Sequence, residues 1–107
     1  MITGDDSLIV PTTSIGGEGV ISVAANLIPR QISAMTHYAL NGDYNSAAAI
    51  QLDIQSLVED LFAEGNPSGV KAAMHSVGLC ENVVRLPLVP VSEKLYNSLA
   101  EKTKRLL

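Results

Sequence analysis

The chain of 107 residues carries seven Lys and Arg against eleven Asp and Glu, and its basic residues form no stripe. This acidic balance argues against a nucleic acid or an anionic membrane as partner, and no apolar run approaches the roughly 20 residues of a membrane span. The length of 107 residues is in the range of a single small domain with one core.

The single cysteine, Cys80, excludes an internal disulfide, and residues 1–5 lack the pattern of a signal peptide. Both features favour a cytoplasmic protein. The mean hydropathy is positive, +0.24, and 17% of the residues are charged, against about 25% in ordinary soluble domains. We expect such a chain to bury part of its surface against another polypeptide.

The first 30 residues predict a strand, a helix and a second strand. Residues 1–3 predict a short strand, Gly4 a turn, and Asp5 or Asp6 the cap of the following helix. A glycine-rich stretch then leads into a strand over 20–24, which lacks the polar alternation of a half-solvated strand. This order predicts a parallel βαβ unit in which both faces of the second strand are covered.

Two helices that meet at a tight corner follow. Residues 30–41 predict the first, which Gly42 ends, and residues 44–64 predict the second, which Asp43 caps and Gly65 closes. Along the second helix, apolar residues recur at helical spacing while the charged residues lie off that stripe. The stripe consists of Ala47, Ile50, Ile54, Leu57, Val58 and Leu61.

The last third predicts two more helices and a connector between them. Asn66 is expected to cap a helix that has Pro67 at its first position and ends at Gly78. Residues 85–92, "RLPLVPVS", contain two prolines among apolar residues and predict an extended, packed connector. Ser92 then caps a final helix. The residues expected on its inward face are Leu95, Tyr96, Leu99 and Leu106.

Two parallel strands cannot close a sheet by themselves, and the segments after residue 30 predict helices. The missing strands must come from elsewhere, so the sequence has the character of the end of a larger α/β barrel.

Three segments carry a resemblance to a known family: "ITGDDSLIVPTTSIGGEGVISVAANLIPRQ", "LFAEGNPSGVKAAMHSVGL" and "RLPLVPVS". Together they resemble the C-terminal portion of the dihydrodipicolinate synthase (4-hydroxy-tetrahydrodipicolinate synthase) family of pyruvate-dependent Schiff-base lyases. The resemblance implies an α/β fold, the last two strands of a TIM (β/α)8 barrel with a C-terminal helical extension, mostly helical in the isolated chain. On this basis we expect residues 1–41 to form the last two strand–helix units of the barrel and residues 42–107 to form the helical extension.

The resemblance also implies a reaction. In this family pyruvate forms a Schiff base with a barrel lysine and then adds to aspartate semialdehyde, without a cofactor, in lysine and diaminopimelate biosynthesis. The lysine and the tyrosine that relays protons lie on earlier strands, so the isolated chain is expected to be inactive and to need an upstream barrel half or a homo-oligomer. Two alternatives stay open: a related sialic acid or keto-deoxy sugar acid aldolase, and a non-catalytic helical assembly module.

Two residues match positions of the family's pyruvate pocket. Ile21, in "GVISV", matches the residue that contacts pyruvate, and Gly4, in "TGDD", matches a turn beside the same pocket. The resemblance places both at the carboxyl ends of the last two barrel strands, on the face where ligands bind in such barrels. A plain core isoleucine, and a glycine that serves only the backbone, remain alternatives.

No metal, cofactor or nucleotide site is indicated. Asp5 and Asp6 are adjacent at a helix start, where carboxylates act as a cap and a partner of the helix dipole, and no His or Cys stands near them with ligand spacing. The glycine-rich stretch 16–19 lacks the lysine of a phosphate-binding loop and precedes a strand, so it predicts a turn.

The remaining reactive residues have structural interpretations. Lys71 lies on a predicted helix, where its ammonium is expected to reach solvent or a carbonyl rather than to form a Schiff base. His37 and His75 are single histidines on helices and are expected to be solvated or hydrogen-bonded. Cys80 is expected to be a small buried filler.

Overall fold

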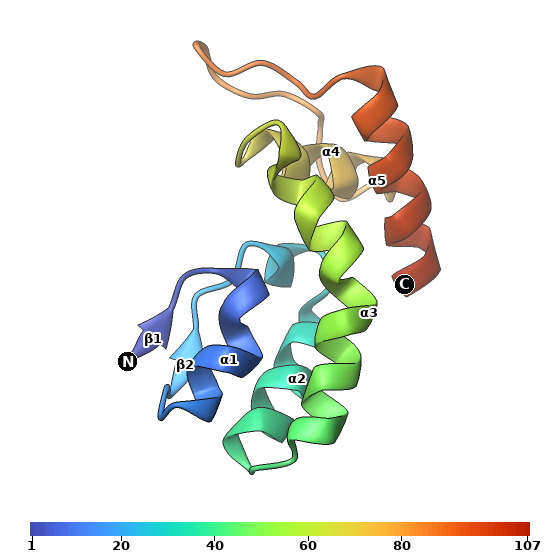
Figure 1. The fold of residues 1–107 in the computed structure, drawn as a ribbon. Coiled ribbons are helices and arrows are strands. Elements are labelled where there is room, and N and C mark those ends of the chain that lie inside the picture. The colour runs from blue at the N-terminus through green and yellow to red at the C-terminus, as the bar shows by residue number, and fades with distance from the viewer. The chain divides into compact units, whose positions relative to one another are not determined.

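The computed structural model describes all 107 residues, which form two compact units, Met1–Gln55 and Ser56–Leu107. The 20-residue helix α3 (Tyr44–Ala63) contributes to both units (Figure 1). The expected boundary between barrel units (1–41) and helical extension (42–107) is a different division from these two compact units, and it stays a prediction.

The first unit begins with the predicted parallel βαβ arrangement. Strand β1 (Ile2–Thr3) pairs in parallel with β2 (Gly19–Val20), and the register sets Ile2 beside Gly19 and Thr3 beside Val20. The 3₁₀ helix η1 (Asp6–Leu8) and the helix α1 (Ile9–Ser14) connect the two strands (Figure 1). The prediction of two parallel strands joined by a crossover helix is confirmed.

The second strand is shorter than the sequence predicted. Beyond Val20 the predicted strand over 20–24 is wrong, because Val23 has helical backbone angles (φ −75°, ψ −45°) and the 3₁₀ helix η2 (Ala24–Asn26) follows it. The first N–H group of η2 donates to the Asp6 carboxylate at 3.1 Å. This long-range hydrogen bond holds the chain in a turn and overrides the strand preference of the β-branched residues.

Helices α2 (Pro29–Leu40) and α3 meet at the predicted corner. Gly42 has a φ of +80°, and the amides of Gly42 and Asp43 donate to the carbonyls of Ala39 and Tyr38 at 3.1 and 2.8 Å. This pair of bonds is a Schellman motif, which favours glycine because its central residue needs a positive φ. The Asp43 carboxylate then accepts the Ser46 N–H at 3.1 Å, so the predicted cap is confirmed.

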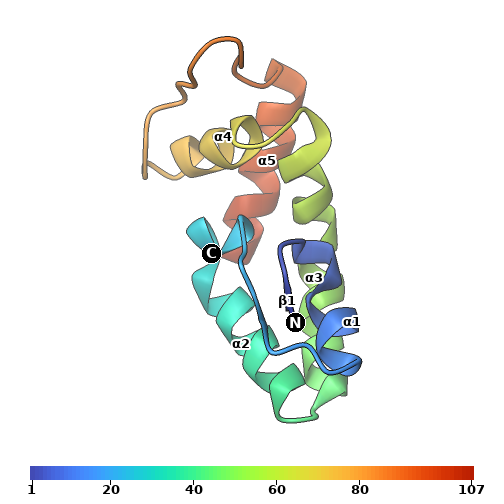
Figure 2. The same cartoon turned by 90° about the vertical axis from the view of Figure 1, so that its left-hand side faces the viewer.

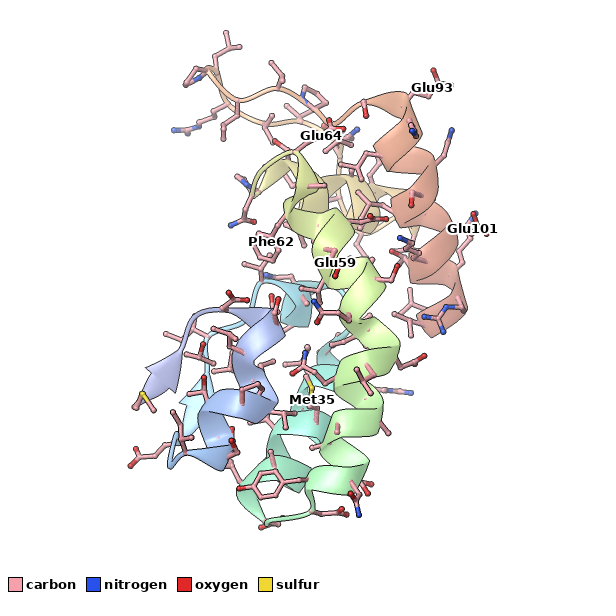
Figure 3. All side chains as sticks on the ribbon, viewed as in Figure 1. Met35, Glu59, Phe62, Glu64, Glu93 and Glu101 are labelled. Carbon is pink, nitrogen blue, oxygen red and sulfur yellow. The ribbon has the colours of Figure 1, made fainter.

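The core of the first unit is apolar and continuous. Helix α1 packs against α2, and α2 packs against η2; Figures 1 and 2 show α2 beside the first half of α3. Helices as short as α1 are unstable alone, so burial rather than helix propensity stabilises them. The buried apolar residues of this unit are Ile9, Ala24, Leu27, Ile28, Ile32, Met35, Ala39, Ala47 and Ile54 (Met35 is labelled in Figure 3).

In the second unit, α4 (Ser68–Ser76) begins one residue later than predicted. Pro67 occupies the N-cap position instead of Asn66, because its backbone lies outside the helical region while its carbonyl accepts the Lys71 N–H at 3.0 Å. Close packing fixes this start. A Cβ atom on Gly69 would lie 2.0 Å from the Leu61 carbonyl oxygen, so only glycine fits where α4 meets the end of α3.

The connector over residues 85–92 is irregular, as its prolines require, but it is not packed. Leu86 is 86% exposed and Val89 is 64% exposed, so the prediction of a packed connector is wrong for this chain. The segment projects away from α4 as a loop (Figures 1 and 2). Most of its apolar side chains are exposed, although the Ser68 hydroxyl donates to the Val89 carbonyl at 2.9 Å.

Helix α5 (Glu93–Leu106) packs against α4, and Ser92 caps it as predicted by accepting the Leu95 N–H at 3.3 Å. Leu95 and Leu99 are buried, which confirms the predicted inward face, whereas Tyr96 and Leu106 are only half-buried. The sequence did not predict that Thr103 is fully buried on the same face.

A carboxylate at the end of α3 fixes the start of α5. Glu64 accepts the Ser92 hydroxyl at 2.6 Å and the Ser92 N–H at 2.8 Å; Figure 3 shows this end of α3. The hydroxyl bond, and after it the backbone bond, lower the pKa of Glu64 below its ordinary value of 4.5. Asp60, also from α3, contacts α5 further along that helix: its carboxylate accepts the Ser98 hydroxyl at 2.6 Å and pairs with the Lys102 ammonium at 2.8 Å.

The lowered pKa of Glu64 predicts an acid-dependent contact. A carboxylate whose pKa is lowered by folding stabilises the fold above its unfolded-state pKa, and this contribution is lost as the pH falls through the folded-state value. In urea titrations between about pH 7 and about pH 3, Glu64→Gln should be less stable than wild type at neutral pH, and the gap should close below pH 4.5. Glu59→Gln, on α3 just before Glu64, removes no such contact and serves as the control, so its stability at neutral pH should stay close to that of wild type. A gap that stays constant with pH would contradict this assignment.

Candidate functional site

The two predicted site residues lie side by side at the carboxyl ends of the strands. Gly4 follows β1 and Ile21 follows β2, and the parallel register that pairs Thr3 with Val20 brings the next residues of both strands together. The Ile21 N–H donates to the Thr3 carbonyl at 2.9 Å, which extends the ladder by one bond. Ligands of parallel α/β folds bind at this edge of the sheet.

Both residues are open to their surroundings in this chain. Ile21 is 75% exposed, so the predicted cover on both faces of its strand is absent and that prediction is wrong for the chain by itself. A Cβ atom on Gly4 would meet no atom within 4 Å. The two-stranded sheet has an unpaired edge on each side, and such edges readily accept another strand.

A buried carboxylate joins the loops that carry these two residues. Asp6 is fully buried; one of its oxygens accepts the Ser22 hydroxyl, and the other accepts the Ala24 N–H at 3.1 Å. The Ser22 oxygen in turn accepts the Ala25 N–H at 3.0 Å. The loop after β1 is thereby fastened to the loop after β2, immediately beside Ile21.

Gln51 holds the same region from α3. Its side-chain amide donates to the Asp6 carbonyl at 2.9 Å, and its amide oxygen accepts the Val10 N–H at 3.3 Å. Gln51 is buried although it is polar, and these two bonds satisfy it. Sequence reasoning missed this residue, because a glutamine on a helix carries no local sign of a partner 45 positions away.

Asp5 and Asp6 take different roles. Asp5 caps η1 by accepting the Ser7 N–H at 2.9 Å, which confirms the prediction of an aspartate cap. Asp6 does not cap this helix, since its oxygens are taken by the loop after β2. The two carboxylates therefore do not act as a pair.

The other predicted assignments agree with the structure in most respects. The Lys71 ammonium donates to the Val83 carbonyl at 2.9 Å, which confirms that it reaches a carbonyl. His37 and His75 are exposed, with their Nδ1 atoms 2.8 Å from the Ser33 carbonyl and 2.7 Å from the Tyr96 hydroxyl. Cys80 is half-buried rather than buried.

No three His, Cys, Asp or Glu side chains come together in a group that could hold a metal ion. None of the helices has both the length and the apolar character to cross a membrane. A shallow hollow in the second unit is lined mainly by Asp60, Glu64, Ser92 and Ser98, whose polar groups bond to one another as described above.

The parallel strands, the crossover helix and the unpaired edges define part of a parallel α/β fold. Its family is shown by comparison: the family model described as "Dihydrodipicolinate synthetase family" matches residues 1–106, so the chain belongs to this family. The 4-hydroxy-tetrahydrodipicolinate synthase of Methanosarcina barkeri is 44% identical over 106 residues, which are 99% of this chain and 36% of that protein. The chain thus spans about a third of the length of its relatives.

Solved structures agree with this assignment. The crystal structure of dihydrodipicolinate synthase from Aquifex aeolicus matches with a TM-score of 0.92 and 41% identity, over 97% of this chain and 36% of that one. The chloride-inhibited enzyme from Acinetobacter baumannii, complexed with pyruvate, matches with a TM-score of 0.92 and 34% identity, over 98% of this chain and 36% of that one. The chain therefore has the backbone of a part of these enzymes.

The contacts of Gln51 predict a specific cost of replacing its amide. Gln51→Met keeps the shape of the side chain but leaves the Asp6 carbonyl and the Val10 N–H without their partner. We expect the free energy of unfolding to fall by about 1–3 kcal/mol, measured by urea denaturation. Gln55→Met, one turn along α3, removes no such bond and should have little effect. Equal stability of the two variants would show that the Gln51 bonds contribute nothing.

Proposed function

We propose that the chain is the C-terminal part of a lyase that condenses pyruvate with aspartate semialdehyde through a lysine Schiff base, in lysine and diaminopimelate biosynthesis. The observation that carries this proposal is the family match over residues 1–106, together with relatives named 4-hydroxy-tetrahydrodipicolinate synthase. One matching enzyme has been crystallised with pyruvate. These names favour aspartate semialdehyde over a sialic acid or a sugar acid as second substrate.

Gly4 and Ile21 are the proposed pyruvate-contacting residues of this chain. Their shared place at the carboxyl edge of the parallel strands supports this role, since that edge forms the ligand-binding face of a (β/α)8 barrel. The exposure of Ile21 supports it as well, because a side chain that only filled the core of this chain would be buried. No metal or cofactor has a role in the proposed reaction.

The lysine and the tyrosine of the reaction are proposed to come from outside this chain. A Schiff-base lysine needs an apolar, desolvated setting that makes its amine partly neutral. The four lysines of the chain lack such a setting: Lys71 binds a carbonyl, Lys102 pairs with Asp60, and Lys94 and Lys104 are exposed. The isolated chain is therefore proposed to be inactive.

The proposed partner is a polypeptide equivalent to the upstream two thirds of the relatives, acting with this chain in the cytoplasm. The open edges of the β1–β2 sheet support this, since parallel strands on both sides would satisfy their unpaired backbone groups. A second copy of the chain could occupy the same edges, which would make the chain a non-catalytic assembly module. The experiment below separates these outcomes.

The test is a chimera in which this chain replaces the matching third of the Aquifex aeolicus synthase, to which it is 41% identical. The chimera should condense the two substrates, and borohydride should trap pyruvate on a lysine of the upstream part. Ile21→Lys should weaken pyruvate binding at least about 100-fold, because an ammonium buried in an apolar wall is costly. Ile15 is equally exposed, at 75%, but it precedes β2 and lies toward the amino end of that strand. Ile15→Lys should therefore leave pyruvate binding intact.

Three results would contradict the proposal. They are a folded chimera that does not condense the substrates, unchanged pyruvate affinity in Ile21→Lys, and a stoichiometric borohydride adduct on a lysine of the 107-residue chain by itself. The last result, above all at Lys71, would place the chemistry within this chain.

A further inference from the structure

Asp6 is the one fully buried carboxylate of the chain, and no basic side chain pairs with it. Burying an unpaired carboxylate is costly unless hydrogen bonds replace its water shell. Here a hydroxyl and a backbone N–H replace it, from Ser22 and Ala24. The carboxylate therefore links η1 to the loop after β2, a connection that an apolar residue of the same size could not make.

Hydrogen bonds hold the chain on both sides of the candidate site, and the bonds of the Asp6 carboxylate are those after Ile21. The turn that carries Gly4 is held on one side by the Asp5 N–H, which donates to the Thr3 hydroxyl oxygen at 3.1 Å. Two bonds hold the backbone at Ile21. The Ile21 N–H donates to the Thr3 carbonyl, and the hydroxyl of the next residue, Ser22, donates to the Asp6 carboxylate. Asp6 thus closes a loop of contacts around the two residues.

We propose that Asp6 is a positioning residue for the pyruvate site, acting through Ser22 and Ala24 to fix the Ile21 peptide beside Gly4. This inference rests on the proposed function. Asp6 is not a catalytic residue, because its oxygens are fully buried and already occupied, so it touches neither the substrate nor the reacting atoms. Its effect on the reaction is to hold one wall of the pocket in place.

The same chimera provides the test, with two matched variants. Asp6→Asn keeps the shape of the side chain but loses one acceptor oxygen and the charge, so either the Ser22 or the Ala24 bond is broken or weakened. Asp5→Asn makes the same chemical change one residue away and keeps a good cap. Asp6→Asn should raise the KM for pyruvate about tenfold or more, with kcat and the KM for aspartate semialdehyde changed less than about threefold.

A second set of variants tests the route through Ser22. Ser22→Ala should raise the KM for pyruvate as Asp6→Asn does, because it removes the hydroxyl that donates to the Asp6 carboxylate. Ser22→Thr, which keeps a hydroxyl, should restore the wild-type value. Amide hydrogen exchange in the 107-residue chain gives a readout without activity: the Ala24 N–H should exchange faster in Asp6→Asn, and at the wild-type rate in Asp5→Asn.

The outcomes separate this inference from the proposed function. An active chimera in which Asp6→Asn and Asp5→Asn have the same pyruvate KM would overturn the inference and leave the proposed function standing. If Asp6→Asn lowered the stability and kcat and raised both KM values together, its role would be a general structural one. That result would also overturn the inference. If the chimera with the unchanged chain is inactive, the proposed function fails and the pyruvate role of Asp6 fails with it.

Discussion

The first unit of this chain depends on one buried carboxylate. Asp6 has no cationic partner, and its oxygens are satisfied only if the loop after β2 turns back toward η1. That turn ends the strand at Val20 and starts η2, while Gln51 holds the Asp6 backbone from α3. Because a buried charge without these bonds would be strongly destabilising, the positions of the two strand ends are tightly coupled. The candidate site lies where this coupling acts.

Much of the fold was predictable because its signals are local. Helix ends need a residue that can adopt a positive φ or a side chain that can accept an amide, and Gly42, Gly78, Asp43 and Ser92 supply these at the predicted places. The apolar stripe of α3 predicted its buried face, with Ile50 half-buried at its edge. The parallel order of the strands followed from the crossover helix predicted between them.

The features that the sequence did not predict depend on distant partners. Nothing near Asp6 shows that its carboxylate is taken by residues 16 and 18 positions away, so the strand over 20–24 was extended too far. The exposure of Ile21 and Leu86 was missed for a related reason: their apolar character predicts burial, but no part of this chain covers them. Gly4 and Ile21 were placed at one edge by resemblance, and the register brings them together there.

The central claim is that strands of an upstream polypeptide complete the open β1–β2 sheet. The most direct measurement is native mass spectrometry, with amide hydrogen exchange, of this chain mixed with the upstream two thirds of the Aquifex aeolicus synthase. We predict a complex with one copy of each, and new protection of the amides of β1 and β2 that face the unpaired edges. The claim would be contradicted if the chain formed no complex with the upstream part, or if it associated only with its own copies at these edges.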